Sequence, residues 1–208
     1  MLRLTARRTW RFFETFVGPE DHALPPDNFQ EDPTPVVARR TSPTNIGLQL
    51  LSFVSAVDLG FITRAEMIDR VEKVFRSLER MRRYRGHFFN WYELSELRVL
   101  EPGYVSTVDS GNFAGHLIAL KQGCYEMLKD SSCTVEDAKR LRAIAERAHA
   151  YAVEMDFRFL FDEKRKLFTI GYHVGSNAVD NSYYDLLASE SRLASFIAVA
   201  KDDVSVDH

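Results

Sequence analysis

Helical segments joined by alternately short and long connections dominate this chain and restrict the folds open to it. In the clearest segment, which follows a capping box of Thr63 and Glu66, apolar residues recur every three or four positions. These residues are Met67, Ile68, Val71, Val74, Phe75, Leu78 and Met81. Five more helices are predicted over 4–16, 43–59, 110–129, 134–155 and 182–201. The pattern predicts a mainly α protein built from helical hairpins.

Three connections have a distinctive composition. Residues 17–43 form a Pro-rich loop with six prolines, for which a plain surface linker is the alternative interpretation. Residues 83–109 form an aromatic loop, which we expect to be ordered because disordered segments are poor in aromatic residues. A charged turn at 162–166 lies between two apolar runs and predicts a small β-hairpin over 157–174.

Composition excludes several classes of protein. The 208 residues, 45% of them hydrophobic, are expected to form a single domain over 1–208. A net charge of −3 argues against a nucleic-acid partner, and no run of about 18 apolar residues predicts a membrane span. Cys124 and Cys133 are read as reduced intracellular thiols. The histidines show no ligand spacing, so neither a metal nor a cofactor is expected.

The aromatic loop has the composition of a sugar-binding surface, because sugars stack on aromatic rings and their hydroxyls need fixed hydrogen-bond partners. The candidate contacts in and after this loop are His87, Asn90, Trp91, Tyr92, Glu93, Asp109 and Asn112. Glu31 of the Pro-rich loop is a further candidate. The alternatives are loop anchoring for His87 and Trp91, an exposed loop acid for Glu93, and helix N-capping for Asp109.

Glu190 is the candidate for acid–base chemistry. It lies three or four positions from Leu186, Leu187 and Leu193, and therefore on the apolar face of the last predicted helix. Burial would raise the pKa of its carboxyl and keep it protonated, as a general acid requires. A purely structural glutamate, paired with an arginine such as Arg192, is the alternative.

The start of the same predicted helix holds three more candidates. Ser182 and Asp185 have the spacing of a capping box, which is the structural alternative to a sugar contact for Asp185. Tyr183 and Tyr184 suit either a core position or a sugar platform.

Five blocks, in the same order, resemble one family. The blocks are PPDNFQEDP (25–33), RRTSPTNIGLQLLS (39–52), GHFFNWYE (86–93), YVSTVDSGNFAGHL (104–117) and SYYDLLASESRLASFIAVAK (182–201). Together they resemble the glucoamylase-like cyclisation domain of cyclic β-1,2-glucan synthases, which is related to endo-β-1,2-glucanases. The resemblance covers essentially the whole chain. Glu93 stands where that family leads us to expect an aspartate, and Ala23 where it leads us to expect a tryptophan.

The resemblance implies a partial (α/α)6 toroid, the first half to two-thirds of the barrel, with long loops on the substrate side. It implies cleavage and cyclising transglycosylation of linear β-1,2-glucan by a retaining mechanism, with Glu190 as acid/base. The family's second carboxylate lies several helices further on, beyond His208. The chain is therefore expected to be a fragment that is inactive in isolation.

Two other functions remain open: a non-catalytic carbohydrate-binding or structural remnant, and a toroid related to disaccharide phosphorylases, which would need a phosphate pocket. The expected partner is a β-glucan oligosaccharide or polysaccharide. A half barrel should also expose apolar helix faces and self-associate through them. The resemblance implies a location in the cytoplasm, or on the cytoplasmic side of the bacterial inner membrane within a membrane-bound synthase.

Overall fold

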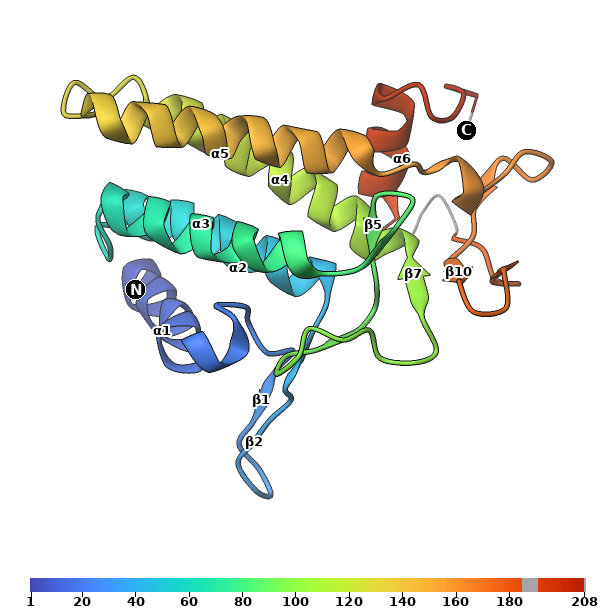
Figure 1. Ribbon diagram of the computed structural model, residues 1–208, viewed down its shortest axis with the longest axis horizontal. Coiled ribbons are helices and arrows are strands. Elements are labelled where there is room, and N and C mark those ends of the chain that lie inside the picture. The colour runs from blue at the N-terminus through green and yellow to red at the C-terminus, as the bar shows by residue number, and fades with distance from the viewer. Residues whose placement is uncertain (185–190, 208) are drawn as a thin grey trace.

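The computed structural model describes residues 1–184 and 191–207. Its α-helices form two layers, with α3 in front of α2 and α5 in front of α4 in Figure 1. The outer layer holds α3 (Arg64–Arg80) and α5 (Val135–Glu154), and the inner layer holds α2 (Pro43–Asp58), α4 (Thr107–Met127) and α6 (Arg192–Ala200). Helix α1 (Leu2–Phe16) packs against α2. From α2 onward, inner and outer helices alternate along the chain, and the predicted mainly α, partial toroid architecture is confirmed.

Local signals in the sequence set the helix ends. Ser42 caps α2 by accepting a hydrogen bond from the Asn45 amide, and Thr63 and Glu66 form the predicted capping box of α3. Thr134 caps α5 in the same way. Each of these three caps satisfies backbone amides that would otherwise lack a partner at the start of a helix.

The start of α4 differs from the prediction. Ser106 is the N-cap, because its hydroxyl accepts a hydrogen bond from the Asp109 amide at 3.2 Å. The helix therefore begins at Thr107, three residues earlier than expected. The N-capping alternative for Asp109 is wrong, since this carboxylate lies at the third helical position.

Short antiparallel strands tie the connections together. They are β1 (Phe29–Gln30) with β2 (Val36–Val37), β3 (Arg40–Thr41) with β6 (Tyr92–Glu93), β4 (Arg83–Tyr84) with β5 (His87–Phe88), β8 (Phe161–Asp162) with β9 (Leu167–Phe168), and β10 (Gly171–His173) between β7 (Tyr104–Ser106) and β11 (Ala178–Val179). The 3-10 turns Pro19–Asp21 and Arg158–Leu160 complete the elements. The predicted hairpin is present as β8–β9, while β10 pairs with the distant β7.

The last helix begins later than its cap signal predicts. Tyr183 forms a β-bridge with Thr169, and the Tyr184 amide donates to the Phe168 carbonyl at 3.0 Å. These partners hold residues 183 and 184 in an extended conformation, so the prediction of a helix capped by Ser182 is wrong there. In the described part of the chain α6 starts at Arg192, and both Asp185 and Glu190 lie outside the described residues.

Helix α4 is the centre of the core and contacts α2, α5 and α6. Its buried residues occupy several faces. On one of these faces the backbone of α4 comes close to the backbone of α6. A Cβ on Gly111 would lie 2.6 Å from the Ala194 backbone, so only glycine fits the present α4–α6 packing. The start of α6 is thereby fixed beside the first turns of α4.

The two cysteines are free thiols in different surroundings. Cys124 is buried in α4, and burial raises the pKa of its thiol to about 12. Cys133 is half-buried in the connection between α4 and α5, which is yellow at the left of Figure 1. Among the described helices, none has both the length and the apolar character needed to cross a bilayer.

Candidate functional site

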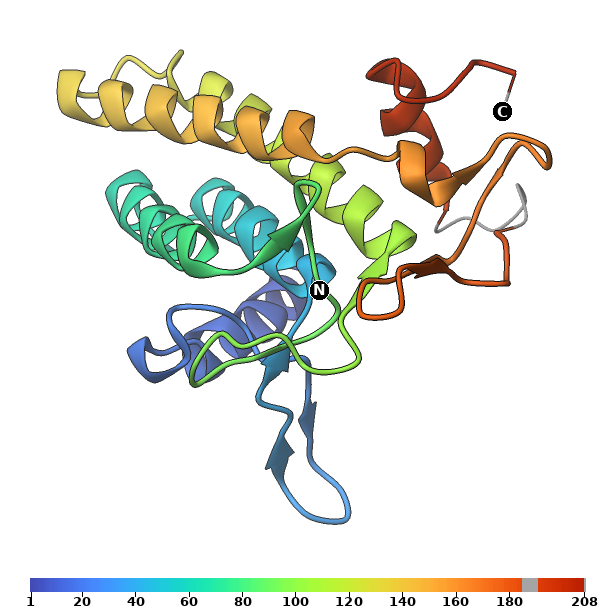
Figure 2. The ribbon, with the colours of Figure 1, turned by 45° about the vertical axis from the view of Figure 1, so that its right-hand side comes forward.

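The long connections meet at one end of the inner helices. Pairing of β3 with β6 joins the Pro-rich loop to the aromatic loop, and pairing of β7 with β10 joins the aromatic loop to the segment after α5. Figures 1 and 2 show β7 and β10 at the opposite end of α4 from its connection to α5, and the β1–β2 hairpin projecting from the helices. We call this assembly of connections the loop end.

Trp91 presents a fixed aromatic ring at the loop end. The Arg40 guanidinium lies over its ring, with 4.6 Å between Cζ and the centroid. Asp27 in turn holds Arg40 through hydrogen bonds of 3.0 and 3.2 Å to one carboxylate oxygen. The half-buried ring is therefore oriented by two segments of the Pro-rich loop.

Asn90, the residue before Trp91, has a side-chain acceptor without a hydrogen-bond partner in the described part of the chain. Its backbone amide donates to the Tyr104 carbonyl at 2.8 Å, which fixes the backbone. Its side-chain Oδ1 is buried and has no hydrogen-bond partner among the described residues. An unpaired buried acceptor is costly, so a hydroxyl donor from a ligand or from water would stabilise it.

A cluster of Tyr104, His173 and Asp180 was not among the sequence-based candidates. The Tyr104 hydroxyl donates to Asp180 Oδ2 at 3.5 Å, and the Tyr104 and His173 rings lie 4.8 Å apart. Burial raises the pKa of Tyr104, and the nearby Asp180, Tyr184 and Asp109 raise it further. The hydroxyl therefore stays protonated and able to donate. The β7–β10 pairing assembles this cluster, and no local sequence signal reveals that pairing.

Asp109 and Asn112 lie on the first two turns of α4. The Asp109 carboxylate makes no hydrogen bond or ion pair with any described residue, and the amide-rich helix start favours its negative charge. Asn112 Nδ2 donates to Thr44 Oγ1 at 3.2 Å and links α4 to α2. Asp109 is thus a candidate carboxylate at the start of α4 without a partner in the described part of the chain.

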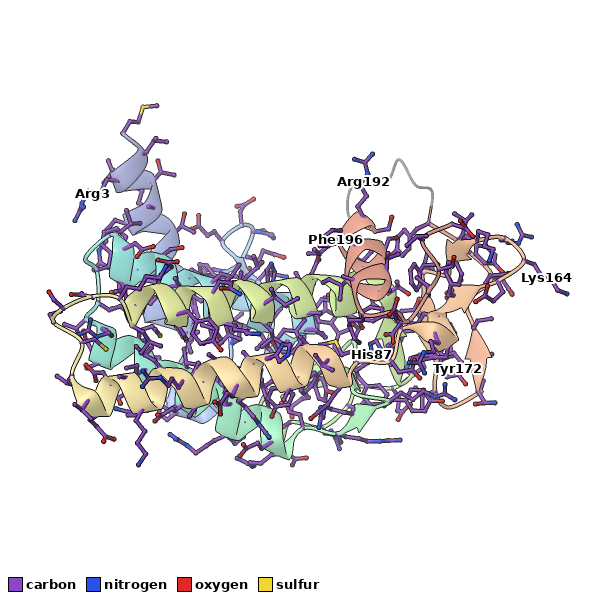
Figure 3. All side chains as sticks on the ribbon, turned by 90° about the horizontal axis from the view of Figure 1, so that it is seen from above. Arg3, His87, Lys164, Tyr172, Arg192 and Phe196 are labelled. Carbon is purple, nitrogen blue, oxygen red and sulfur yellow. The ribbon has the colours of Figure 1, made fainter. Side chains whose placement is uncertain are left out.

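His87 is an anchor of the aromatic loop and is 0% exposed. Its Nδ1 lies 2.8 Å from Ser110 Oγ and its Nε2 lies 2.8 Å from the Asp156 carbonyl. Both ring nitrogens are therefore used by the protein, as the loop-anchoring interpretation predicts. Figure 3 shows His87 inside the molecule, between α4 and α5.

Tyr92 and Glu93 also hold the loop in place. The fully buried Tyr92 hydroxyl donates to the Arg82 carbonyl and accepts from the Phe89 amide. Burial would raise the pKa of Glu93, but hydrogen bonds to its carboxylate from the amides of Ser95 and Glu96 outweigh burial and lower it. In this conformation neither side chain is free for a sugar contact.

The remaining candidate sugar contacts in the described residues lie in different parts of the structure. The Tyr183 hydroxyl donates to Asp162 Oδ2 at 2.8 Å and so faces the β8–β9 hairpin. Tyr184 lies close enough to Tyr104 to raise its pKa, as expected from the alternation of side chains along an extended segment. Glu31 is exposed on the projecting β1–β2 hairpin. Among residues 1–184 and 191–207, no three His, Cys, Asp or Glu side chains are grouped to hold a metal ion.

Comparison with solved structures defines the class of fold. A protein from Bacteroides caccae described as a glucoamylase matches with a TM-score of 0.74 and 18% identity, over 94% of this chain and 46% of that one. The endo-β-1,2-glucanase from Chitinophaga pinensis, solved with sophorotriose and glucose, matches with a TM-score of 0.69 and 14% identity, over 95% and 46%. The chain therefore has part of the glucoamylase-like (α/α)6 architecture.

Comparison of sequences gives the family. No family model matches the chain. The cyclic β-(1,2)-glucan synthase NdvB of Rhizobium meliloti (strain 1021) is 34% identical over an alignment of 322 positions that includes the whole chain. The chain spans 11% of the length of that relative. This chain belongs to the family of glucoamylase-like domains of cyclic β-1,2-glucan synthases.

Proposed function

We propose that this domain binds linear β-1,2-glucan and takes part in its cleavage and cyclising transglycosylation by a retaining glycoside-hydrolase-type mechanism. The observation that carries the proposal is the identity to a cyclic β-(1,2)-glucan synthase along the entire chain. We further propose that the domain works on the cytoplasmic side of the bacterial inner membrane, as one part of a larger synthase.

The chemistry of the loop end supports a neutral, hydroxyl-rich ligand. Arg40 covers one face of the Trp91 ring, so a sugar would stack on the other face, and Asn90 Oδ1 supplies an unpaired acceptor. The Tyr104 hydroxyl oxygen, whose proton is donated to Asp180, and the Asp109 carboxylate add two further acceptors. Sugars are held by this combination of aromatic faces and directed hydrogen bonds.

Glu190 is the proposed general acid. Ser191, the next residue, is 3% exposed, and the helix that follows packs on α4 two residues beyond Asp109. This packing supports the choice of an acid from that segment. A retaining mechanism needs a second carboxyl about 5 Å from the first, which we assign to a more distant part of the synthase.

Binding and turnover of linear β-1,2-glucan test the proposal. Calorimetric titration of the 208-residue protein should show binding of β-1,2-glucan and none of a β-1,3-linked chain of equal length. Any turnover should fall at least about 100-fold in Glu190→Gln, the usual contribution of general acid catalysis. Undiminished turnover in this variant would refute the role of Glu190, and absence of binding would refute the glucan assignment.

A purely binding function is the second candidate, because Trp91 and Asn90 require no contribution from Glu190. Binding by the 208-residue protein, with Glu190→Gln leaving activity of the complete synthase unchanged, would favour it. The phosphorylase-related alternative has one structural feature in its support, a hollow of about 540 Å³ lined by Arg80, Arg82 and Arg98. Turnover that depends on added inorganic phosphate would favour that alternative.

A further inference from the structure

A hollow lined by arginines lies beside the segment that holds Trp91. It has a volume of about 540 Å³ and lies between the end of α3 and residues 97–101 of the aromatic loop. The Leu100 amide donates a hydrogen bond to the Trp91 carbonyl at 2.8 Å, so the hollow adjoins the proposed sugar-binding surface. Its guanidinium groups are those of Arg80, Arg82 and Arg98. We call this feature the arginine hollow.

The protein does not balance the positive charge of the arginine hollow. None of the three arginines forms an ion pair with any described residue. The carboxylates of Glu93, beside Arg98, and of Glu101 accept hydrogen bonds from backbone amides instead. Of these two acids only Glu101 lines the hollow. Three positive charges therefore face one negative charge, and the excess attracts an anion.

Two of the guanidinium groups are held in place. The Arg82 guanidinium lies over the buried Phe89 ring, with 5.4 Å between Cζ and the centroid. Arg80 Nη1 lies 3.3 Å from His22 Nδ1, and His22 Nε2 lies 2.9 Å from the Ser95 carbonyl. This carbonyl can only accept, so His22 Nε2 carries the proton and Nδ1 accepts from Arg80. Groups that are already ordered lose less conformational freedom when a ligand binds.

The third arginine is placed by a tight turn. Leu97 has a φ of 57°, a left-handed conformation that is uncommon for a residue with a large side chain. The chain turns back there, and the Glu93 amide donates to the Arg98 carbonyl at 2.8 Å. Leu97, Val99 and Leu100 also line the hollow and give it an apolar wall. The hollow thus combines a cationic part with an apolar part.

We infer that the arginine hollow binds a ligand that carries a phosphate group. Guanidinium groups bind phosphate oxygens through paired, charge-assisted hydrogen bonds, and they are more weakly hydrated than the ammonium group of lysine. The volume lies within the range of about 300–1,000 Å³ typical of sites for small organic ligands, which leaves room for a sugar or another organic moiety against the apolar wall. The phosphate group remains on the ligand, so the inference requires no phosphorolysis and does not rest on the proposed function.

Two sources of the phosphate group share this chemistry, a soluble sugar phosphate and the headgroup of an anionic lipid. Calorimetric titration at fixed ionic strength should show binding of glucose 6-phosphate and none of glucose. Cosedimentation with vesicles of phosphatidylglycerol then decides the source. Vesicle binding that glucose 6-phosphate displaces would identify a lipid headgroup, and absence of vesicle binding would identify a soluble ligand.

Substitution of the arginines tests the site itself. The double variant Arg82→Gln/Arg98→Gln should bind glucose 6-phosphate at least about tenfold more weakly, because it loses charge-assisted hydrogen bonds. Arg142→Gln is the matched control, since this exposed arginine of α5 forms no ion pair with a described residue, and it should bind like the parent protein. The melting temperatures of all three proteins should agree, because the replaced side chains are exposed.

Two outcomes would overturn the inference. The first is that the parent protein does not distinguish glucose 6-phosphate from glucose. The second is that the double variant binds glucose 6-phosphate as tightly as the parent protein does. Neither outcome depends on binding or turnover of β-1,2-glucan, so the proposed function stands or falls separately.

Discussion

The protonation state of His87 follows from its two partners. The Asp156 carbonyl can only accept a hydrogen bond, so His87 Nε2 must carry the proton and donate. Nδ1 then accepts from the Ser110 hydroxyl. Burial opposes the charged form and lowers the pKa of His87 to about 4. A neutral imidazole is therefore part of what holds the aromatic loop to α4.

This lowered pKa predicts a loss of stability in acid. Below about pH 6.5 the unfolded chain takes up a proton on His87, whereas the folded protein does so only near pH 4. The unfolded state binds more protons in this window, so the free energy of unfolding falls as pH drops. The contribution of His87 to this fall reaches at most about 3 kcal/mol.

Urea unfolding between pH 7.5 and 4 measures this contribution. His87→Gln removes the titrating group, so the variant should be less stable at neutral pH but should lose less stability on acidification. His173→Gln is a suitable control, because that ring is partly exposed at the surface of β10. Equal pH slopes for the parent protein and His87→Gln would contradict the prediction.

Among the described residues, Trp91 should contribute most to the affinity of the protein for glucan. Trp91→Ala removes the stacking surface and should weaken binding about tenfold, equivalent to about 1.4 kcal/mol. Tyr125→Ala, an exposed aromatic near the other end of α4, should leave affinity unchanged. Calorimetry with linear β-1,2-glucan distinguishes the two, and equal affinities would remove Trp91 from the site.

At the scale of elements, the α4–α6 contact is the most sensitive to a small change. In Gly111→Ala the new Cβ would clash with the Ala194 backbone, so α6 must shift. We expect a loss of about 1–3 kcal/mol in the free energy of unfolding and faster proteolysis near Ser191. Gly175→Ala, where nothing lies within 4 Å, should be nearly neutral. A stable Gly111→Ala variant would show that α6 can move at little cost.

The helices and their caps could be predicted from sequence because their determinants are local. Thr63 with Glu66, and Thr134 with Asp137, form contacts within one helical turn. The Tyr104–His173–Asp180 cluster could not be predicted, since it depends on pairing of β7 with β10 some 65 residues away. The helix start predicted at Ser182 is wrong for a related reason. The segment carries a helix-cap signal, but a β-bridge between Tyr183 and Thr169 keeps it extended.

At the scale of the whole molecule, glucan binding links stability to ligand concentration. A ligand that binds the folded state stabilises it by mass action, so the melting temperature should rise with the concentration of linear β-1,2-glucan. Trp91→Ala should show a smaller rise, whereas Tyr125→Ala should behave like the parent protein. Calorimetric scans over a range of glucan concentrations provide the measurement, and a melting temperature that does not change for the parent protein would contradict it.

The contrast between the two cysteines gives the protein a built-in attachment point. Cys124 is enclosed in α4 with its thiol held protonated, so maleimide reagents should react at Cys133 alone. Cys133 lies at the opposite end of α4 from β7 and β10. A fluorophore placed there would leave the loop end free, so glucan binding could be followed on labelled protein without any engineered cysteine.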